Sequence, residues 1–564
     1  MRRWTEVAAR VAATSRTSEK TAILAGYLAG LPAGDLAIAC TYLTGRPFPE
    51  NDPRAVGLGW AGVAAAVGAV AGRPPEALRE AYDRHSDVAR AAEDLLARVG
   101  HDPDPALSPT LADVDEAFAA IERASGASAR ADLLAALLGR CDPPTARGVV
   151  MVLGGELRIG LREGLLEAAI ARAFDRPLAD VKRASQLTGE LGRTALLAAE
   201  DRLGEAELTL FRPLKPMLAS PAEDAAAIVD RFGAEVWVED KYDGIRAQLH
   251  RAGERVALYS RDLHDVTGQF PEVAAGAADL AWDGALDGEI LAYRDGTVLP
   301  FLSLQARLGR KAPSASILAE VPVIFVAWDV LAAGPTDAPI DVLIDRPLRE
   351  RRARLEALAL PLADEGGVFA LSHLDRVRGV DGLEAAFAAA RERRNEGLMV
   401  KDPEGRYTPG RRGYGWMKLK KALATIDCVV VGVEVGHGKR HGVLSDYTFA
   451  VRDEASGDLV TIGKAYSGLT DAELDESGRW FEAHTISRHG RYRVVEPVVV
   501  VEIAFDVIMR STRHRSGFAL RFPRIARLRP DKSVDEIDTL ATVAAIHEGL
   551  QAGAEHLVTA SARR

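Results

Sequence analysis

The period of the hydrophobic residues changes along this chain at a proline-rich segment, residues 211–221 (FRPLKPMLASP). Before this segment, apolar residues recur at i, i+4 and i+8, the period of a buried helical stripe. After it, short β-rich runs are separated by turns. Because its prolines interrupt both patterns, we interpret 211–221 as a linker. The helical stripe is clearest at Leu165, Leu166, Ala169, Ile170, Ala173 and Phe174, and again at Leu133, Leu134, Leu137 and Leu138, with Gly139 as a C-cap.

The change of pattern predicts a multidomain fold, in keeping with a length of 564 residues. Residues 1–205 are expected to form an all-α domain. Residues 206–422, with runs such as EVWVED and VIFVAWDV, predict an α+β domain. Residues 423–564 contain strands spaced by glycine-containing turns, which favour a small closed β-barrel of the oligonucleotide-binding type (OB-fold). The last thirty or so residues resemble a helical or frayed tail.

The composition excludes several classes of protein. Apolar residues make up 48% and charged residues 27% of the chain, a mixture typical of globular proteins. Cys40, Cys141 and Cys428 lie far apart without a CxxC pair, which excludes a disulfide framework and a four-cysteine zinc module and indicates a reducing cytoplasm. The uncharged run 55–72 is too weakly hydrophobic for a membrane span, and the first twenty residues lack the features of a secretory signal. We expect no association with a membrane.

The net charge of −10 argues against a nucleic-acid partner, but the charge is unevenly distributed. Residues 407–421 contain two arginines and three lysines without an acid. Residues 510–529 also lack acids and contain seven arginines, at 510, 513, 515, 521, 524, 527 and 529. A charge run is usually only a solvated surface. Two such runs in acidic surroundings instead indicate local phosphate-binding patches.

The segment EDKYDGIR (239–246) is the most informative one for chemistry. We expect one strand to bring Lys241 to a tight turn at Asp243 and Gly244, and a second, adjacent strand to carry Arg246. A lysine fixed in this way is a candidate amine nucleophile, because burial and cationic neighbours lower the pKa of an amine. An exposed lysine in an ordinary hairpin explains KYDG equally well.

Four further elements follow in order, each with charged residues beside an expected strand. Arg261 follows a strand within SRD, and Glu289 is expected at the start of the strand in DGEIL. Glu396 precedes the strand GLMVK, and Lys418 and Lys420 alternate in WMKLKK so that both face one side. Nucleotidyl transfer needs such a set: cations for the phosphates, acids for Mg²⁺ and an amine that attacks the α-phosphorus.

With these motifs the chain resembles the ATP-dependent DNA ligases, of the type shared by archaea and some bacteria. KYDGIR is similar to the family signature KxDGxR, and six further motifs match in the same order: SRD, LDGEIL, VAWDVL, EGLMVK, WMKLKK and GFALRFPRIARLRPDK. PLKPMLA and GKAYSGLTDAEL are also typical of these ligases. The similarity covers nearly the whole chain.

The resemblance implies a role for each matching residue. Lys241 would accept AMP, and the other ATP-binding residues would be Glu239 at the adenine edge, Arg246 at the ribose, Trp328 stacked on adenine, and Arg261, Arg412, Lys418 and Lys420 near the phosphates. Glu289 and Glu396 would serve Mg²⁺ and the ribose. The terminal motif, with Arg521, Arg524, Arg527 and Lys532, would orient pyrophosphate. The family more often has phenylalanine at position 328, where a tryptophan in the core is the plain alternative.

The resemblance also implies an activity and its partners. The protein would seal 5′-phosphate/3′-hydroxyl nicks in duplex DNA, in replication, repair or recombination, with ATP and Mg²⁺. Lysyl-AMP would form first, AMP would pass to the 5′-phosphate, and the 3′-hydroxyl would then displace it. We expect a monomer in the cytoplasm, associated with the nucleoid, whose helical domain binds duplex DNA. Clamp or repair proteins cannot be identified as partners from the sequence.

Other interpretations remain at this stage. An RNA ligase or a capping guanylyltransferase would share the lysine motif, although the helical domain and PLKPMLA argue against both. A DNA-binding protein without catalytic activity could keep the same fold. An NAD-dependent ligase is disfavoured because four zinc-binding cysteines are absent.

Two other patterns carry little weight. The segment 433–440 fails as a P-loop because Val433 and Arg440 occupy the positions of the first glycine and the Ser/Thr. His437 and His441 have the spacing of helical metal ligands but lie in a glycine-rich turn without a third ligand.

Overall fold

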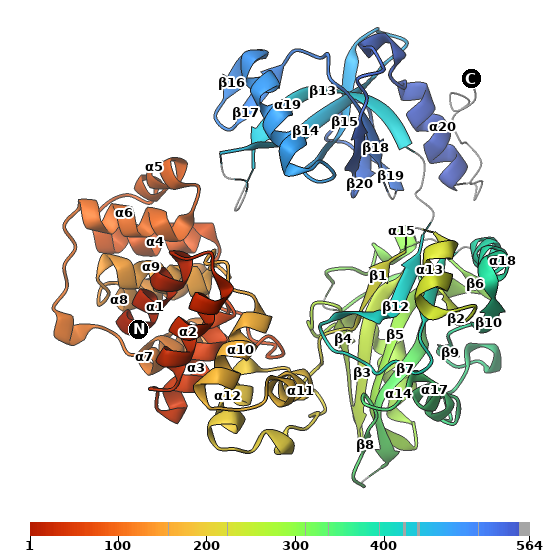
Figure 1. Ribbon diagram of the computed structural model, residues 1–564, viewed down its shortest axis with the longest axis horizontal. Helices are drawn as coiled ribbons and strands as arrows, with labels where there is room; N and C mark the ends of the chain where they lie inside the picture. The colour runs from red at the N-terminus through yellow and green to blue at the C-terminus, as the bar shows by residue number, and fades with distance from the viewer. Residues whose placement is uncertain are drawn as a thin grey trace. The chain divides into compact units, whose positions relative to one another are not determined.

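The chain divides into two compact units, Met1–Leu419 and Lys420–Arg564. The computed structural model (Figure 1) describes residues 1–155, 157–222, 224–299, 301–310, 312–336, 338–393, 395–420, 425–436, 440, 442–505 and 507–551.

The first part of the larger unit is helical and is coloured red to yellow in Figure 1. Among the described residues before 200 there is no strand, as the sequence predicts. Capping groups fix several helix ends: Thr110 and Asp113 form a capping box, and Asp142 caps the helix that begins at Pro143. The helices are α1 (Arg2–Ala12), α2 (Thr17–Leu28), α3 (Ala33–Leu43), α4 (Trp60–Ala71), α5 (Glu76–His85), α6 (Val88–Arg98), α7 (Leu111–Arg123), α8 (Ala127–Leu138), α9 (Pro143–Leu153), α10 (Glu163–Ala173), α11 (Leu178–Thr188) and α12 (Leu191–Ala199).

The predicted helical stripes form most of the core of this region. Leu166 and Ile170 of α10 are buried, and so are Leu134 and Leu138 of α8. The prediction was wrong for Leu133, which is 38% exposed. Adjacent residues on a helix point about 100° apart, and at this point of α8 only the side of Leu134 faces the core, whereas Leu137 and Leu138 are both buried one turn later.

The second part of the larger unit contains two sheets. The first sheet has the strand order β1-β12-β11-β2-β10. The second has the order β4-β3-β5-β7-β8, with β6 beside β5 and β9 beside β7. The strands are β1 (Leu218–Pro221), β2 (Glu235–Asp240), β3 (Ile245–Ala252), β4 (Arg255–Ser260), β5 (Trp282–Arg294), β6 (Thr297–Val298), β7 (Val323–Pro335), β8 (Asp341–Val342), β9 (Phe369–Leu371), β10 (Leu374–Arg378), β11 (Leu398–Lys401) and β12 (Arg412–Leu419), and the helices are α13 (Ala225–Phe232), α14 (Pro271–Ala278), α15 (Phe301–Leu304), α16 (Ala315–Glu320), α17 (Leu348–Glu356) and α18 (Gly379–Glu392).

The first sheet has one apolar and one polar face. Val238, Val400 and Leu419 lie on the apolar face and form a core with Ile228 of α13 and Leu383 of α18. Successive residues of a strand point to opposite faces, so the residues between them lie on the other face. This alternation directs Glu239, Lys401 and Lys418 away from α13 and α18, whereas Asp240, at the end of β2, lies on the apolar face.

Part of the predicted linker is a strand. Residues 218–221 form β1, which pairs in parallel with β12, and Gln248 binds both the amide and the carbonyl of Leu214. Pro213 and Pro216 precede β1, and Pro221 is compatible with the strand because β1 lies at the edge of the sheet, where a missing N–H can break no ladder. The segment before β1 is therefore attached to the second sheet through β3.

The smaller unit is rich in strands, as predicted. One sheet has the order β15-β14-β13-β17-β16, β18 pairs with both β13 and β21, and β19 and β20 form a separate hairpin. Tyr447, Phe449 and Phe481 lie at the centre of its core. The elements are β13 (Thr425–Val435), β14 (Leu444–Arg452), β15 (Leu459–Ala465), α19 (Asp471–Ala483), β16 (Thr485–His489), β17 (Tyr492–Val495), β18 (Val500–Ala504), β19 (Val507–Arg510), β20 (Phe518–Arg521), β21 (Arg524–Leu528) and α20 (Leu540–Gln551).

Several sequence-based expectations concern residues outside the described part of the chain. These are Lys421, the expected domain border at 422/423, and the turn residues His437, Lys439 and His441. Within the described part, no helix has the length and apolar character needed to cross a membrane. The three cysteines are buried free thiols. The weakly hydrophobic run 55–72 contains α4, whose Val67 is fully buried.

Candidate active site

Lys241 lies where the chain passes from one sheet to the other. The residue before it ends β2 in the first sheet, and β3 begins at Ile245 in the second. The predicted hairpin was therefore wrong, because β2 and β3 do not pair with each other. The amide of Lys241 donates to the carbonyl of Gly397 (2.8 Å), and the amide of Glu396 donates to the carbonyl of Lys241 (2.7 Å).

The Lys241 amine forms an ion pair with Glu396, which precedes β11 as predicted. Both side chains are largely enclosed, with 18% and 27% of their surfaces exposed. The ion pair joins two residues that are 155 positions apart in the chain. The structure thus brings together the predicted nucleophile and one of the two predicted metal-binding acids.

Gly244 allows the crossover to lie against β5. A Cβ atom at this position would be 2.4 Å from the carbonyl oxygen of Ile290 and 2.7 Å from Cγ of Glu289. Only glycine fits such a close approach. The contact also places the Lys241 loop beside Glu289, the second predicted acid.

Glu289 lies in the middle of β5, not at the start of a strand as predicted. It is opposite Arg246 of β3, so both side chains are on the same face of the second sheet. Burial raises the pKa of Glu289 to about 8, and the charges of Lys241 and Arg246 oppose this rise in part. The carboxyl group therefore lies in an enclosed place close to both cations.

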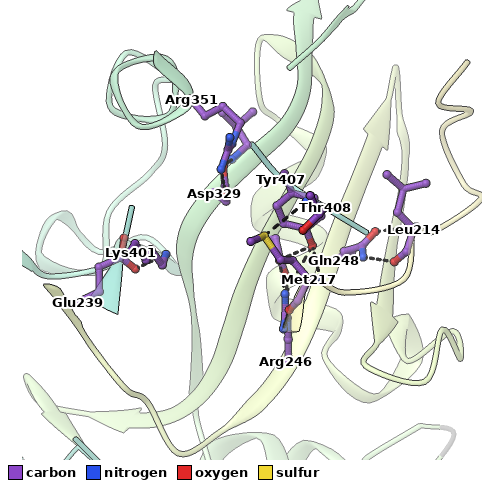
Figure 2. A network of polar contacts seen from close by, with 12 residues as sticks. Leu214, Met217, Glu239, Arg246, Gln248, Asp329, Arg351, Lys401, Tyr407 and Thr408 are labelled. Atoms are coloured by element: carbon purple, nitrogen blue, oxygen red, sulfur yellow. Dashed lines mark hydrogen bonds and ion pairs between the residues drawn. The ribbon is translucent and has the colours of Figure 1, made fainter. Parts of the chain in front are cut away.

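Arg246 is held in a polar network that is partly drawn in Figure 2. Its Nε and Nη2 atoms donate to the two oxygens of Asp287 (3.1 and 2.7 Å), and Nη1 donates to the carbonyl of Met217 (2.7 Å). The Tyr407 hydroxyl donates to Asp287 (2.8 Å) and accepts from the amide of Met217 (3.1 Å). Burial, and then the Asp287 carboxylate, raise the pKa of Tyr407, so this hydroxyl keeps its proton.

This network contains residues that the sequence did not indicate as functional. Asp287 belongs to the DGEIL motif, but the sequence assigns it no role, and it assigns none to Tyr407 or Met217. Met217 does lie within PLKPMLA, a segment typical of these ligases, and this was the one available signal for it. No local signal identifies Tyr407, because its contact with Asp287 spans 120 positions.

Glu239 and Lys401 form a buried ion pair on the polar face of the first sheet, at 2.7 Å (Figure 2). Only 2% of either side chain is exposed. The second oxygen, Oε1, lies 3.9 Å from Arg352 and has no hydrogen-bond partner among the described residues. A buried acceptor of this kind is suited to a donor on a ligand.

Trp328, in β7, lies beside these charged groups. Its ring centre is 5.4 Å from the Arg246 guanidinium and 5.9 Å from the Lys401 amine. The next residue, Asp329, is fully buried in a bidentate pair with Arg351 (Figure 2), which fixes this part of β7. The indole N–H of Trp328 is buried without a hydrogen-bond partner among the described residues.

Lys418 is on the same face as Glu239, because the register runs from Lys418 through Met399 to Glu239. Arg412 begins β12, and the exposed Arg261 directly follows β4. β12 ends at Leu419, so Lys420 follows the strand that was expected to contain it and begins the smaller unit. The alternation of Lys418 and Lys420 along one strand was therefore wrong.

The terminal motif belongs to the smaller unit. Arg521 ends β20, Arg524 begins β21, and Arg527 pairs with Glu502 of β18. Lys532 donates to Asp427 of β13 (2.6 Å), which also binds Arg529 through both oxygens (3.0 Å each). These pairs attach the end of the motif to the first strand of this unit.

The residues of the larger unit suit a divalent cation bound together with phosphates. No three His, Cys, Asp or Glu side chains form a metal-binding group in the described part of the chain. Glu289 and Glu396 nevertheless both lie near the Lys241 amine. Mg²⁺ is commonly held by one or two carboxylates together with substrate phosphates, so two acids are enough.

Comparisons with known proteins agree with this arrangement. The family model "DNA ligase N terminus" matches residues 1–171, "ATP dependent DNA ligase domain" matches 216–420, and "ATP dependent DNA ligase C terminal region" matches 440–532. Each match falls on one of the regions described above.

Individual relatives carry the same names. The chain is 45% identical to a "Probable DNA ligase" of Opitutus terrae over 96% of its own length, and spans 61% of the length of that relative. It is 44% identical to a "Probable DNA ligase" of Koribacter versatilis (94% of this chain, 93% of the relative) and 34% identical to a "DNA ligase" of Methanothermobacter thermautotrophicus (97% of both). The solved structure Pmar-Lig_Pre has a TM-score of 0.60 at 16% identity, over 93% of this chain and 99% of that one, a likeness in fold alone.

Proposed function

The chain belongs to the family of ATP-dependent DNA ligases, and we propose from this premise that it seals nicks in duplex DNA through an AMP bound covalently to Lys241. One observation carries the assignment. The Lys241 amine is paired with Glu396 and lies near Glu289 at the crossover between two sheets. Two residues earlier, Glu239 pairs with Lys401, whose amine lies 5.9 Å from the Trp328 ring centre. A nucleophile, acids and an adenine-sized aromatic surface are the groups that the first chemical step needs.

The pocket residues suggest how ATP binds. The Oε1 atom of Glu239, which has no hydrogen-bond partner among the described residues, would accept from the amino group of adenine, while Lys401 binds the other oxygen. Trp328 offers its ring as a stacking surface. Arg246, fixed by Asp287, faces the ribose side, and Arg261, Arg412 and Lys418 supply cations for the phosphates.

The reaction then follows in three steps. The uncharged Lys241 amine attacks the α-phosphorus of ATP, a phosphoramidate bond forms, and pyrophosphate leaves. An oxygen of the 5′-phosphate attacks the same phosphorus, and the bond to Lys241 breaks. The 3′-hydroxyl next attacks the 5′-phosphorus, a phosphodiester forms, and AMP leaves. Glu396 holds the amine in place and is the nearest acceptor for its proton.

Glu289 and Glu396 are the residues that would hold Mg²⁺ together with the ATP phosphates. Bound there, the ion would offset the negative charge that develops on the phosphates. In its absence desolvation raises the pKa of Glu289 and favours the protonated carboxyl group, while the charges of Lys241 and Arg246 oppose this rise.

The smaller unit supplies the remaining functions of this proposal. We assign it an OB-fold in which Arg521, Arg524 and Lys532 orient the pyrophosphate of ATP, with Lys420 close to the phosphates. The domain borders would lie near residues 205 and 422. We place the enzyme, as a monomer, in the cytoplasm at the nucleoid, where nicked DNA arises in replication and repair.

Labelling with α-³²P-ATP tests the proposal. The native protein should retain the label after denaturation, and Lys241→Ala should not. Lys20→Ala is a control, because Lys20 also has an enclosed amine, which donates to the carbonyl of Ile159 (2.6 Å), but it lies in the helical region outside the ligase motifs. This variant should be labelled normally.

A panel of nicked substrates distinguishes the alternatives. Sealing of nicked DNA, without sealing of nicked RNA or transfer of GMP, is the expected result. Labelling by NAD in place of ATP, or labelling without any sealing, would contradict the proposed function.

A further inference from the structure

Asp240, the residue before Lys241, is held by a polar cluster that the mechanism above does not use. Its carboxylate accepts two hydrogen bonds from Arg393, Nε to Oδ2 (2.8 Å) and Nη2 to Oδ1 (2.7 Å). Asn395 donates a third, from Nδ2 to Oδ2 (2.9 Å). We call Asp240, Arg393 and Asn395 the Asp240 clamp.

The clamp is enclosed on the side of Asp240. The Asp240 side chain is 3% exposed and Asn395 is buried, whereas the Arg393 side chain is 39% exposed. A buried carboxylate is stable only when it is paired and hydrogen-bonded, and the bidentate guanidinium meets that need. Asp240 lies on the apolar face of the first sheet, opposite to the face that carries Glu239. The clamp therefore cannot contact a ligand in the Glu239 pocket and acts through the backbone.

The cluster joins three elements at the place where β2 ends. Arg393 directly follows α18, and the amide of Asn395 donates to Ala390 in the same helix (3.0 Å). Arg391 donates to the carbonyl of Asn395 (2.7 Å). The end of α18 and the segment before β11 are thus fixed to the last residue of β2.

This position lies at the end of the β2–β11 ladder. β11 is a strand of four residues, and the backbone bonds of Lys241 to Glu396 and Gly397 lie beyond its end. Directly after Lys241 the chain leaves the first sheet. Terminal pairs of a short ladder open readily when little packs around them. A side-chain clamp one residue away keeps these two bonds closed.

We propose that Asp240, Arg393 and Asn395 are positioning residues that hold the Lys241 amine at Glu396 for the attack on ATP. The inference rests on the proposed function of Lys241. Phosphodiester formation at a nick that already carries AMP uses the 3′-hydroxyl as nucleophile, so that step does not need the lysine. The clamp should therefore matter for charging and not for final closure.

The test compares these two steps in full-length variants. Asp240→Asn keeps the shape but loses the charge, and Arg393→Gln removes the guanidinium from the more exposed side. We expect the maximal rate of lysyl-AMP formation to fall about 10- to 100-fold in both, since small displacements of a nucleophile have effects of this size. The KM for ATP and the closure rate of a pre-adenylylated nick should stay within about threefold of native.

Three further variants separate positioning from general destabilisation. Asp283→Asn breaks another buried Asp–Arg pair of the same unit, with Arg251, and should charge at the native rate even if its melting temperature falls. Arg393→Lys keeps the charge but not the bidentate geometry, so its charging rate should lie between those of the native protein and Arg393→Gln. The double variant Asp240→Asn/Arg393→Gln should charge no more than about threefold slower than the worse single variant.

Native charging rates in both Asp240→Asn and Arg393→Gln would overturn the inference. An equal loss of charging and closure, or losses that merely follow the melting temperatures of all variants including Asp283→Asn, would overturn it as well. Failure of the proposed function has a different signature, namely label retained by Lys241→Ala. In that case the inference falls with it.

Discussion

The carboxyl group of Glu289 lies where ionisation is unfavourable, because burial raises its pKa to about 8. The charges of Lys241 and Arg246 oppose this rise, and those of Asp287 and Asp243 add to it. Glu396 is already paired with Lys241. At the scale of single residues, the two acids therefore differ: the pKa of Glu289 is raised, and Glu396 is ion-paired with Lys241.

The acids supply a first prediction. Glu289→Gln and Glu396→Gln keep the shape of the side chains but cannot supply the carboxylate that would hold Mg²⁺, so charging should fall about 100-fold or more with little change in melting temperature. The rate of lysyl-AMP formation should be measured across a range of Mg²⁺ concentrations. Glu272→Gln is the control, since Glu272 pairs with Arg307 elsewhere in the same unit. Native rates in both variants at ordinary Mg²⁺ concentrations would show that the metal role is wrong.

The residue scale also shows what the sequence could indicate. The motifs EDKYDGIR and EGLMVK, with the family resemblance, indicate four functional residues: Lys241, Glu239, Arg246 and Glu396. In the structure, the segments that carry these residues lie close together. Tyr407 and Asn395 were not chosen, because their partners lie 120 and 155 positions away. A single sequence carries no signal of contacts at such separations.

At the scale of elements, the alternation of apolar residues predicted the strands better than their pairing. EVWVED and IRAQLH do form β2 and β3, but in different sheets. The turn signal at Asp243 and Gly244 favoured a hairpin, whereas Gly244 is needed for the close approach to β5. Leu218–Pro221 was missed as a strand because proline is penalised everywhere in a local reading, although an edge strand accepts it.

The docking of the linker segment on β3 gives a prediction about pH. The amide of Phe211 donates to Nδ1 of His250 (3.0 Å), which requires that nitrogen to be unprotonated. Burial lowers the pKa of His250 from 6.5 to about 3. The contribution of the neutral His250 side chain to the free energy of unfolding is therefore fully present above pH 6.5. As the pH falls from 6.5 towards 3, this contribution is lost, because the unfolded chain binds a proton at His250 and the folded chain does not.

When the pH is lowered from 7 to 5, protonation of His250 in the unfolded chain should lower the free energy of unfolding by about 2 kcal/mol, at about 1.4 kcal/mol for each pKa unit. Urea unfolding at the two pH values measures the difference. His250→Gln should lose this pH-dependent part, whereas His264→Gln, at an exposed turn, should keep it. Equal pH dependence in His250→Gln and the native protein would contradict the argument.

At the scale of the whole molecule, we expect two sets of arginines in the smaller unit to have different roles. Arg521 and Arg524 lie in the terminal motif, and Arg510, Arg513 and Arg515 lie along the β19–β20 hairpin. Deleting 521–532 would remove β21, which pairs with β18, so substitutions are the cleaner test.

We expect Arg521→Ala/Arg524→Ala to slow charging by ATP at least about tenfold, while a pre-adenylylated nick is still closed. Arg510→Ala/Arg513→Ala/Arg515→Ala should charge almost normally, bind DNA more weakly and show a shallower dependence of affinity on salt, by about 0.9 in log–log slope for each DNA phosphate that the variant no longer neutralises. Charging assays and DNA titrations at several salt concentrations measure both effects. If both sets behave like the native protein, these arginines only solvate a surface.

The central claim is that Lys241 carries the AMP, and the most direct measurement of it is peptide mapping. The full-length protein is charged with ATP and Mg²⁺, digested, and its peptides are sequenced by mass spectrometry under conditions that preserve a phosphoramidate bond. The AMP should be found on the peptide that contains Lys241 and on that side chain alone. AMP on Lys418, on Lys420, or on any other residue while Lys241 stays unmodified would contradict the account.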